Sequence, residues 1–331
     1  MIYDCLDIYK QKKILITGGT GFIGSSLVKI LANVSSHVVL LLRKNRQFDE
    51  EWISESKITL IRGDISIRDT WERALDGVEY VFHLASHQSR YGVKPEPVID
   101  LQVNVLPILH LLEICKESKL RVKILFSGSE NEVGVSPRIP VNENFIDNPV
   151  TIFGINKLIA EKYLNYYAQE FGTNTVTLRL SNVYGPTPRY GSALQVVLNK
   201  MIYDALQGKI EIYGDGVFYR DFVFIEDVIH ALLIAGEKIN KISGSFYLIG
   251  SGRKILFVEC VKLIAKRVLL KTSEEPKLAK LSPLVAFSEF DKRNFVADTS
   301  NFCSLTDWGP QISLEKGIDL TIDYFLNNGN V

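Results

Sequence analysis

Two short segments near the middle of the chain carry several side chains that could move protons. The segment ILFSGSENEVG supplies the Ser129 hydroxyl and the carboxyl groups of Glu130 and Glu132, and the segment TIFGINKLIAEKY supplies the Lys157 amine. A hydroxyl, a carboxyl group and an amine held around one substrate atom can act as general acids and bases. Phe153 precedes Lys157 by four residues and cannot transfer a proton. Residues of these types are able to carry acid/base chemistry.

A glycine-rich turn near the start of the chain is suited to holding an anion. In ILITGGTGFIG, the residues Gly18, Gly21 and Gly24, with Phe22 and Ile23 among them, follow an apolar strand candidate and lead into a segment of helical period. Such glycines permit a tight turn and a close approach of the backbone to a pyrophosphate, and the first N–H groups of the helix face the anion. The turn therefore predicts a dinucleotide-binding site formed by these five residues.

Short apolar runs alternate with segments of helical period, and this order predicts an α/β fold built on a doubly wound parallel sheet of the Rossmann type. The strand candidates are rich in β-branched and other apolar side chains: Ile14–Ile16, Val38–Leu42, Ile58–Ile61, Tyr80–His83, Lys123–Phe126 and Thr175–Leu180. From about Val183 the pattern loosens. We expect a dinucleotide-binding domain over residues 1–182 and a smaller, mainly substrate-binding C-terminal domain over 183–331, with some segments returning to the main sheet.

The composition argues against several classes of partner. The 331 residues are 46% hydrophobic and carry 38 Lys and Arg against 38 Asp and Glu, so no overall field attracts nucleic acid or an anionic membrane. The four cysteines are widely spaced without a CxxC pair, which predicts reduced, mostly buried thiols and no metal site. The first residues lack an apolar core of signal-peptide length, and no later apolar run reaches about 18 residues. We therefore expect a cytoplasmic protein with no nucleic-acid or membrane partner.

Several motifs make the chain resemble the extended short-chain dehydrogenase/reductase family, in its NAD(P)-dependent nucleotide-sugar epimerase/dehydratase branch. They run over nearly the whole chain: TGGTGFIG, Gly63-Asp64-Ile65, His83-Leu84-Ala85, Asn104, the Lys157 helix, Asn182-Val183-Tyr184-Gly185-Pro186, Arg220-Asp221-Phe222 and DWGPQISLEKGI. The resemblance implies an enzyme that transiently oxidises the sugar of a nucleotide-diphosphate sugar, with C4 as the expected carbon. It also implies a homodimer formed through a four-helix interface of the helices that carry Asn104 and Lys157.

In that family a serine or threonine, a tyrosine and a lysine surround the reacting sugar carbon. Ser129 matches the serine and Lys157 the lysine, which also binds the nicotinamide ribose, whereas Phe153 stands where the family has tyrosine. The resemblance therefore implies that another group replaces the phenol. Glu130 and Glu132 match a segment whose carboxyl groups handle protons in nucleotide-sugar 4,6-dehydratases, so we expect them to supply the acid or base. The alternative is that both are solvent-facing loop charges.

The residues after the second strand candidate bear on the choice of cofactor. NAD-binding relatives carry an acidic residue there, where this chain has Arg43 and Lys44. A guanidinium can pair with a 2′-phosphate that a carboxylate would repel, so NADP is favoured over NAD. NAD is the alternative cofactor, for the case in which the two side chains only form a solvated turn or stack on adenine. The resemblance places four further residues along the cofactor: Asp64, Ile65, Leu84 and Ala85.

The resemblance also implies where the substrate is held. It places Arg220 on the diphosphate, Arg293 in a second such position, and Asn182 against the diphosphate or the sugar, since a planar guanidinium can bind two phosphate oxygens. The alternatives are surface salt bridges for the arginines and a turn-forming amide for Asn182. Three more residues are expected to line the sugar pocket: Ser86, Tyr91 and Phe153.

Some polar residues of these motifs are expected to be structural. His83 ends a strand candidate and should be packed and hydrogen-bonded, and Asn104 should brace neighbouring strands. Asp227 should cap a helix that starts at Val228. A turn cap is also the alternative for Asp64.

The sequence leaves the nucleotide, the sugar and the net reaction open. Transient oxidation followed by loss of water or inversion of a centre is favoured, and an NADPH-dependent keto-sugar reductase is the enzymatic alternative. A non-catalytic NAD(P)-binding protein is the third interpretation, in which the missing tyrosine marks a lost activity. Ser129, Lys157 and Arg220 favour an enzyme, because a cofactor sensor would not need an arginine for the sugar diphosphate.

Overall fold

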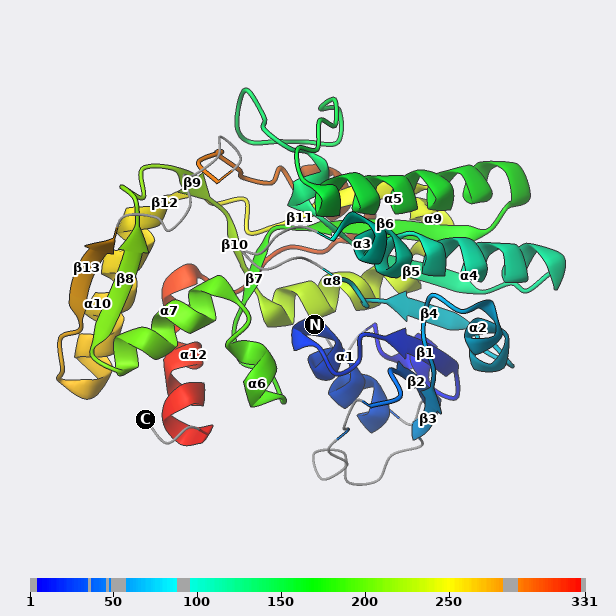
Figure 1. The fold of residues 1–331 in the computed structure, drawn as a ribbon, viewed down its shortest axis with the longest axis horizontal. Helices are drawn as coiled ribbons and strands as arrows, with labels where there is room; N and C mark the ends of the chain where they lie inside the picture. Colours follow the sequence, from blue (N-terminus) through cyan, green and yellow to red (C-terminus); the bar gives the residue numbers. More distant parts are fainter. Residues whose placement is uncertain are drawn as a thin grey trace.

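Seven parallel strands form the central sheet, in the order β11-β6-β5-β4-β1-β2-β3 (Figure 1). The structure is a computed structural model, which describes residues 5–34, 37–45, 48, 58–87, 96–281 and 291–328. The strands of the sheet have these bounds: β1 (Lys13–Thr17), β2 (His37–Leu42), β3 (Ile58–Arg62), β4 (Tyr80–His83), β5 (Lys123–Ser129), β6 (Asn174–Leu180) and β11 (Ser245–Ile249). All six predicted strands are present, and the predicted doubly wound α/β fold is confirmed.

The chain changes its direction of winding between β1 and β4. From β1 it adds β2 and β3 on one side, and β4, β5 and β6 on the other. Thr17 at the end of β1 is the register partner of His83 at the end of β4. Doubly wound sheets bind ligands in the crevice outside the carboxyl ends of such neighbouring strands. The glycine turn follows β1 at this edge of the sheet.

Helices cover both faces of the sheet because the side chains of a strand alternate between its faces. Val38 and Leu40 of β2 belong to the core beneath α1 and α8, whereas Val39 and Leu41 belong to the core shared with α2, α4 and α5. The helices of these two layers have these bounds: α1 (Phe22–Asn33), α2 (Arg68–Ala74), α3 (Pro97–Asn104), α4 (Leu106–Glu117), α5 (Ile152–Phe171) and α8 (Ile225–Glu237).

Among the residues that the structure describes, one segment is apolar enough, by length and composition alone, to cross a membrane: Pro97–Glu117. This finding corrects the expectation that no run reaches that length. In the fold this segment forms α3 and α4, which are separated at Val105. Half of its most apolar stretch is buried inside the structure. Both helices pack against α5. Its apolar character is therefore explained by packing within the fold.

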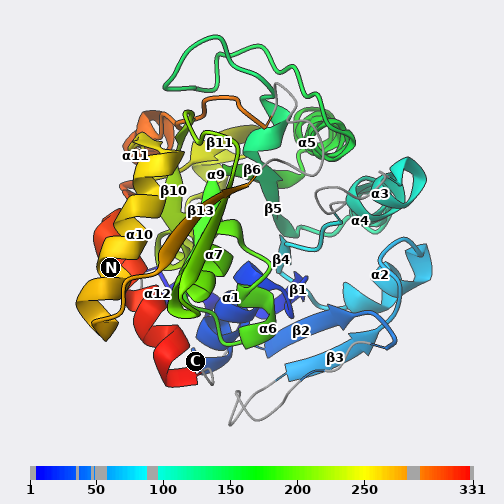
Figure 2. The ribbon, with the colours of Figure 1, turned by 60° about the vertical axis from the view of Figure 1, so that its left-hand side comes forward.

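The C-terminal half builds a second group of elements beside the sheet. Helices α7, α10 and α12 pack around the parallel pair β8–β13, at the left of Figure 1 and in front in Figure 2. Strand β7 pairs with β10 and β9 with β12, whereas β11 joins the main sheet next to β6. The boundary expected after residue 182 stays a prediction. The remaining elements have these bounds: η1 (Asp7–Tyr9), η3 (Glu130–Glu132), α6 (Tyr190–Ala193), β7 (Asn182–Tyr184), α7 (Val197–Leu206), β8 (Lys209–Tyr213), β9 (Tyr219–Arg220), β10 (Phe222–Phe224), α9 (Ile239–Ile242), β12 (Ile255–Leu256), α10 (Phe257–Thr272), β13 (Lys277–Leu281), α11 (Ser300–Thr306) and α12 (Leu314–Asn328).

Candidate active site

The glycine-rich turn joins β1 to α1 and leaves the start of that helix open. Gly18 has a left-handed φ of 71°, and a Cβ on Gly24 would lie 2.1 Å from the Gly18 carbonyl oxygen, so both positions require glycine. Helix α1 begins at Phe22, and its N-cap Gly21 provides no side-chain cap. The first N–H groups of the helix, including that of Ile23, therefore suit an anionic group, and the turn fits a dinucleotide pyrophosphate.

A loop from the C-terminal half contacts this turn. The Thr187 hydroxyl donates to the Phe22 carbonyl at 3.1 Å and lies 2.7 Å from the Ser25 hydroxyl. Arg189 donates from Nη1 to the Thr20 carbonyl at 3.3 Å. The roles of Thr187 and Arg189 were not predicted, because their neighbours in the sequence do not indicate a contact with a turn more than 160 residues earlier.

Arg43 and Lys44 follow β2 directly and are exposed. The Lys44 carbonyl accepts a hydrogen bond from Arg62 Nη1 at 3.3 Å, so a third cationic side chain reaches this corner from β3. Asp64 Oδ1 accepts hydrogen bonds from the backbone N–H and the hydroxyl of Ser66, both at 2.8 Å, and thus caps a turn. The proximity of Asp64 and its neighbour Ile65 to an adenine stays a prediction.

The carboxyl end of β4 is held against β1 by Thr17. His83 is fully buried, and its Nδ1 lies 2.8 Å from the Thr17 hydroxyl. Burial, and next the positive charge of Lys157, lower the pKa of His83 to about 3, so its imidazole is neutral. The expectation of a packed, hydrogen-bonded histidine is confirmed. Thr17 also accepts the Ala85 N–H at 3.2 Å, which places the segment 84–86, with Leu84 and Ser86, beside the glycine turn.

Asn104 braces a loop rather than two strands, which corrects the prediction. Its Nδ2 donates to the His87 carbonyl at 2.7 Å, and its Oδ1 accepts the His87 N–H at 3.2 Å. It therefore ties α3 to the segment that follows β4. Tyr91 falls outside the described residues, and its role in lining a sugar pocket stays a prediction.

Lys157 lies at the end of β5, one helical turn after Phe153. It is 2% exposed, and its Nζ donates to the Ser127 carbonyl at 2.8 Å. The same nitrogen lies 4.4 Å from the centre of the Phe126 ring and 5.7 Å from that of Phe153. Burial lowers the pKa of Lys157 to about 8. The amine therefore faces two aromatic rings, and the correspondence of Phe153 with a family tyrosine stays a prediction.

Glu130 lies among the residues predicted to hold the substrate. It is 6% exposed, and its Oε1 accepts a hydrogen bond from Arg293 Nη2 at 2.7 Å. Its two oxygens lie 3.3 and 3.2 Å from Asn182 Nδ2, and Arg293 also donates to Asn131 Oδ1 at 2.9 Å. Glu132 is fully buried as well. The alternative that the two glutamates are solvent-facing charges is therefore wrong.

Arg220 approaches the same cluster from β9. Its guanidinium donates to the carbonyl groups of Asp291, at 2.7 Å, and Arg293. Burial lowers the pKa of Arg220 to about 10, and burial also lowers that of Arg293, while the Glu130 carboxylate opposes both shifts. Two guanidinium groups from distant parts of the chain thus meet beside one carboxylate.

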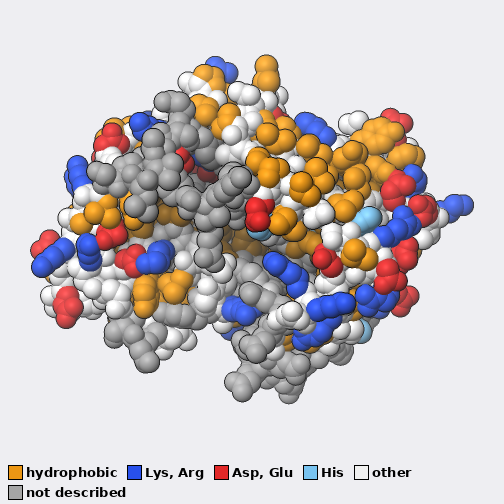
Figure 3. Space-filling model, viewed as in Figure 1, with side chains coloured by type: hydrophobic (Ala, Val, Ile, Leu, Met, Phe, Trp, Pro, Cys, Tyr) orange, Lys and Arg blue, Asp and Glu red, His pale blue; other side chains and the backbone are white. Residues whose placement is uncertain are grey.

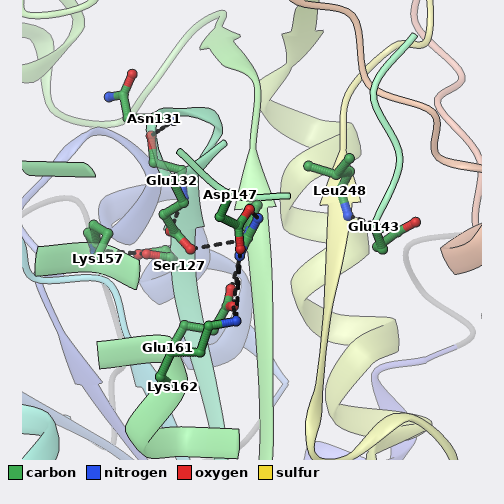
Figure 4. A network of polar contacts seen from close by, with 11 residues as sticks. Ser127, Asn131, Glu132, Glu143, Asp147, Lys157, Glu161, Lys162 and Leu248 are labelled. Atoms are coloured by element: carbon green, nitrogen blue, oxygen red, sulfur yellow. Dashed lines mark hydrogen bonds and ion pairs between the residues drawn. The ribbon is translucent and has the colours of Figure 1, made fainter. Parts of the chain in front are cut away.

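Glu132 points into a different, buried cluster (Figure 4). Its Oε1 accepts the Ser129 N–H at 2.7 Å, and its Oε2 lies 3.0 Å from Nε of Arg179 on β6. Arg179 also pairs with Asp147 and Glu161. This cluster was not predicted from the sequence. The available signal was an arginine between two leucines of a buried strand, because a charge in a central strand requires buried partners.

Asp227 is structural, but it does not cap the predicted helix. Helix α8 begins at Ile225, so Asp227 lies within its first turn. Its two carboxylate oxygens accept the N–H groups of Gln311 at 2.9 Å and Ile312 at 3.1 Å. The residue therefore ties α8 to the segment before α12.

No disulfide joins the four cysteines, of which Cys5, Cys115 and Cys260 are buried and Cys303 is partly exposed. Burial raises the pKa of Cys115 and Cys260 to about 12, so both are protonated at neutral pH. Within the described ranges, no three His, Cys, Asp or Glu side chains are grouped to hold a metal ion.

Comparisons with known proteins cover nearly the whole chain. A model of the NAD-dependent epimerase/dehydratase family matches residues 14–250. The UDP-glucose 4-epimerase of Mycolicibacterium smegmatis is 29% identical over 319 residues, which are 95% of this chain and 98% of the relative. The structure of a UDP-glucose 4-epimerase from Thermotoga maritima with UDP-glucose has a TM-score of 0.81 and 30% identity, over 95% of this chain and 99% of that one. A UDP-glucuronic acid 4-epimerase from Bacillus cereus in complex with NAD has a TM-score of 0.78 and 27% identity, over the same shares.

Proposed function

Since the chain belongs to the NAD-dependent epimerase/dehydratase family, we propose that it oxidises and re-reduces the C4 position of a nucleotide-diphosphate sugar, with Glu130 in place of the missing phenol. The position of Glu130 carries this proposal. More than nine-tenths of this side chain is buried, directly after Ser129, and Arg293 and Asn182 bind its oxygens. A bound nicotinamide dinucleotide would supply the hydride acceptor, so proton transfer falls to the side chains of the protein.

Three side chains divide the proton transfer in this proposal. The Glu130 carboxylate accepts the proton of the sugar hydroxyl, and the Ser129 hydroxyl hydrogen-bonds the same sugar oxygen. Lys157 holds the nicotinamide ribose, and since its pKa is about 8 it can also exchange a proton near neutral pH. General acid/base help of this kind is worth about 10²–10⁴-fold in rate. Phe153 offers a flat ring for packing against the sugar or the nicotinamide.

Arg220 and Arg293 are proposed to bind the diphosphate, and Asn182 the adjoining part of the sugar. Asn182 and Arg293 contact Glu130, and the charge of Glu130 also acts on Arg220, which supports one common site for the diphosphate and the proposed base. The first probe of substrate is UDP-glucose, the ligand in the structure from Thermotoga maritima.

For the cofactor, we infer a preference for NADP over NAD. Arg43 and Lys44 stand exposed after β2, and Arg62 contacts the Lys44 backbone, so three cationic side chains could surround a 2′-phosphate. Family membership and the NAD-bound relative leave NAD as the alternative. Calorimetric titration of the protein with both cofactors decides between them.

The protein is proposed to form a homodimer through α3 and α5. Apolar side chains gather on this face of the molecule (Figure 3), where both helices expose large residues. These residues are Val98, Ile99, Leu101, Ile155, Ile159, Tyr163 and Tyr166. Pairing with a second copy would bury them in a four-helix interface. We also propose that the protein is cytoplasmic and that residues 183–331 form a mainly substrate-binding domain.

The test is incubation with NAD or NADP and UDP-glucose, followed by chromatography and mass spectrometry of the nucleotide sugars. An epimer of the same mass supports the proposal, and loss of water would identify a dehydratase. Oxidation of NADPH added together with a nucleotide-diphosphate 4-keto-sugar, which accepts the hydride, would identify a keto-sugar reductase. The absence of any conversion across UDP, dTDP, GDP and CDP sugars would favour a non-catalytic binding protein. Glu130→Gln should lower turnover about 10²–10⁴-fold, whereas the exposed control Glu226→Gln should not.

A further inference from the structure

Three carboxyl groups meet one guanidinium in the buried cluster behind the active site (Figure 4). Arg179 is 1% exposed and binds both oxygens of Asp147, at 2.6 and 2.8 Å, and both oxygens of Glu161, at 2.8 Å each. Lys162 adds a second positive charge, 3.8 Å from each of these two carboxylates. Arg179 also lies 3.0 Å from Glu132, so two cations serve three carboxyl groups and Glu132 shares its counter-charge with Asp147 and Glu161.

The hydrogen bonds of this cluster distinguish Glu132 from the other two carboxyl groups. Oε2 of Glu132 lies 3.0 Å from Nε of Arg179, but the single hydrogen on that nitrogen goes to Glu161 Oε2 at 2.8 Å. Among the described residues, no group donates a hydrogen bond to Glu132 Oε2, which is buried. A buried carboxylate oxygen with no donor, beside a second carboxylate, is costly. A proton on this oxygen removes the charge and makes it a donor to Glu161.

We propose that Glu132 is a neutral carboxylic acid at neutral pH and a positioning residue for Ser129. One oxygen accepts the Ser129 N–H, and the other, carrying the proton, donates to Glu161 on α5. The side chain thereby links the end of β5 to the helix that carries Lys157. This inference replaces the expectation that Glu132 carries substrate protons, and its catalytic part rests on the proposed function.

The charged groups that face Glu132 are consistent with a retained proton. Burial raises the pKa of Glu132 well above its usual range, and the Glu161 carboxylate raises it further, while Arg179 opposes both. Lys157 faces it from α5 and is itself influenced by Asp100 on α3, but its ammonium donates to a backbone carbonyl rather than to Glu132.

Infrared difference spectroscopy of the full chain tests the protonation state directly. At pH 7, the spectrum of the wild type minus that of Glu132→Gln should contain the carbonyl band of a protonated carboxyl group. Carboxylate bands in its place would overturn the proposal. This measurement needs neither cofactor nor substrate, so it stands even if the proposed function fails.

The dependence of melting temperature on pH gives a second test. Above about pH 4.3 the unfolded Glu132 is ionised while the folded one keeps its proton, so the wild type loses stability as the pH rises and Glu132→Gln does not. From pH 5 to pH 8, Tm of Glu132→Gln should therefore rise relative to wild type, by up to about 6 °C. A relative Tm that is constant or falls would contradict a neutral Glu132. The matched variant Glu161→Gln removes a paired carboxylate and should lower Tm at both pH values.

Turnover of UDP-glucose tests the positioning role. Glu132→Ala should lower kcat more than tenfold with little change in KM, because Ser129 loses the acceptor of its N–H. Glu132→Gln retains an acceptor and a donor and should recover most of that loss. Equally slow Ala and Gln variants, with Tm maintained, would show that Glu132 transfers protons itself. If the wild type does not convert UDP-glucose, the proposed function is in question, and the infrared and melting experiments still decide the protonation state.

Discussion

Replacing Phe153 by tyrosine adds back one hydroxyl beside Lys157, and doing so in a Glu130→Gln variant tests whether Glu130 replaces a phenol. The Phe153 ring is half-buried, with its centre 5.7 Å from Lys157 Nζ. A positive charge about 4–6 Å away favours the ionised form of a phenol. The new hydroxyl therefore enters surroundings that suit a proton-transferring tyrosine, and we expect the variant to fold.

The magnitudes follow from the loss of one acid/base group. Glu130→Gln should slow turnover about 10²–10⁴-fold, equivalent to about 2.7–5.4 kcal/mol of barrier. Phe153→Tyr alone should change the rate less than tenfold, because the wild type already has a base. In the double variant the tyrosine should recover most of the loss, so the interaction energy between the two changes should approach the same 2.7–5.4 kcal/mol.

The assay is the initial rate of UDP-glucose conversion at saturating substrate, for the wild type, the two single variants and the double variant. Phe153→Leu in the Glu130→Gln background is the matched control and should restore nothing. A double variant as slow as Glu130→Gln, with Tm maintained, would refute the idea that Glu130 acts in place of a phenol. Full turnover in Glu130→Gln would refute the same idea more directly, because proton transfer would then not depend on the Glu130 carboxylate.

The remaining predictions concern binding, stability and assembly. Arg43→Asp should weaken the binding of NADP about 10–100-fold, which corresponds to roughly the 1.4–2.8 kcal/mol of a charge-assisted pair, and should change the affinity for NAD less than about threefold. Calorimetry measures both affinities, and equal weakening of both would contradict a 2′-phosphate contact. Arg220→Lys keeps the charge but loses the planar fork, so KM for UDP-glucose should rise about tenfold with little change in kcat. Arg179→Met leaves the carboxylates of Asp147 and Glu161 without their main cation and should cost about 3–5 kcal/mol in chemical denaturation at pH 7. A cost below about 1 kcal/mol, typical of an exposed ion pair, would contradict the dependence of these carboxylates on Arg179. Ile159→Glu should convert a dimer to a monomer in sedimentation, and an unchanged mass would place the interface elsewhere.

The order of strands and helices along the chain could be predicted, because each element depends on the pattern of apolar residues and glycines within its own segment. Each strand candidate became a strand, although β5 continues three residues beyond Phe126 to Ser129. Helix α1 begins at the residue after the glycine turn, because the turn and the helix start are adjacent in the sequence. The burial of His83 was predictable for the same reason, since it ends a strand with apolar neighbours.

Partners far apart in the sequence could not be predicted. Asp227 was expected to cap its own helix, but its carboxylate binds the backbone of Gln311 and Ile312, 84 and 85 residues later. Asn104 binds the loop at His87 instead of bracing strands. In both cases the residue type indicated a structural hydrogen bond, and only the packing of distant segments selected its partner.

By itself, the sequence determined the doubly wound parallel sheet and the order of its strands along the chain. Only the tertiary structure decided which partners Glu130 and Glu132 contact. They are separated by one residue and carry the same carboxyl group, yet the turn of η3 directs Glu130 to Arg293, 163 residues away, and Glu132 to Arg179 on β6. The protonation and role of a carboxyl group depend on its burial and on the charges around it, and both are set by segments that meet only in the folded chain.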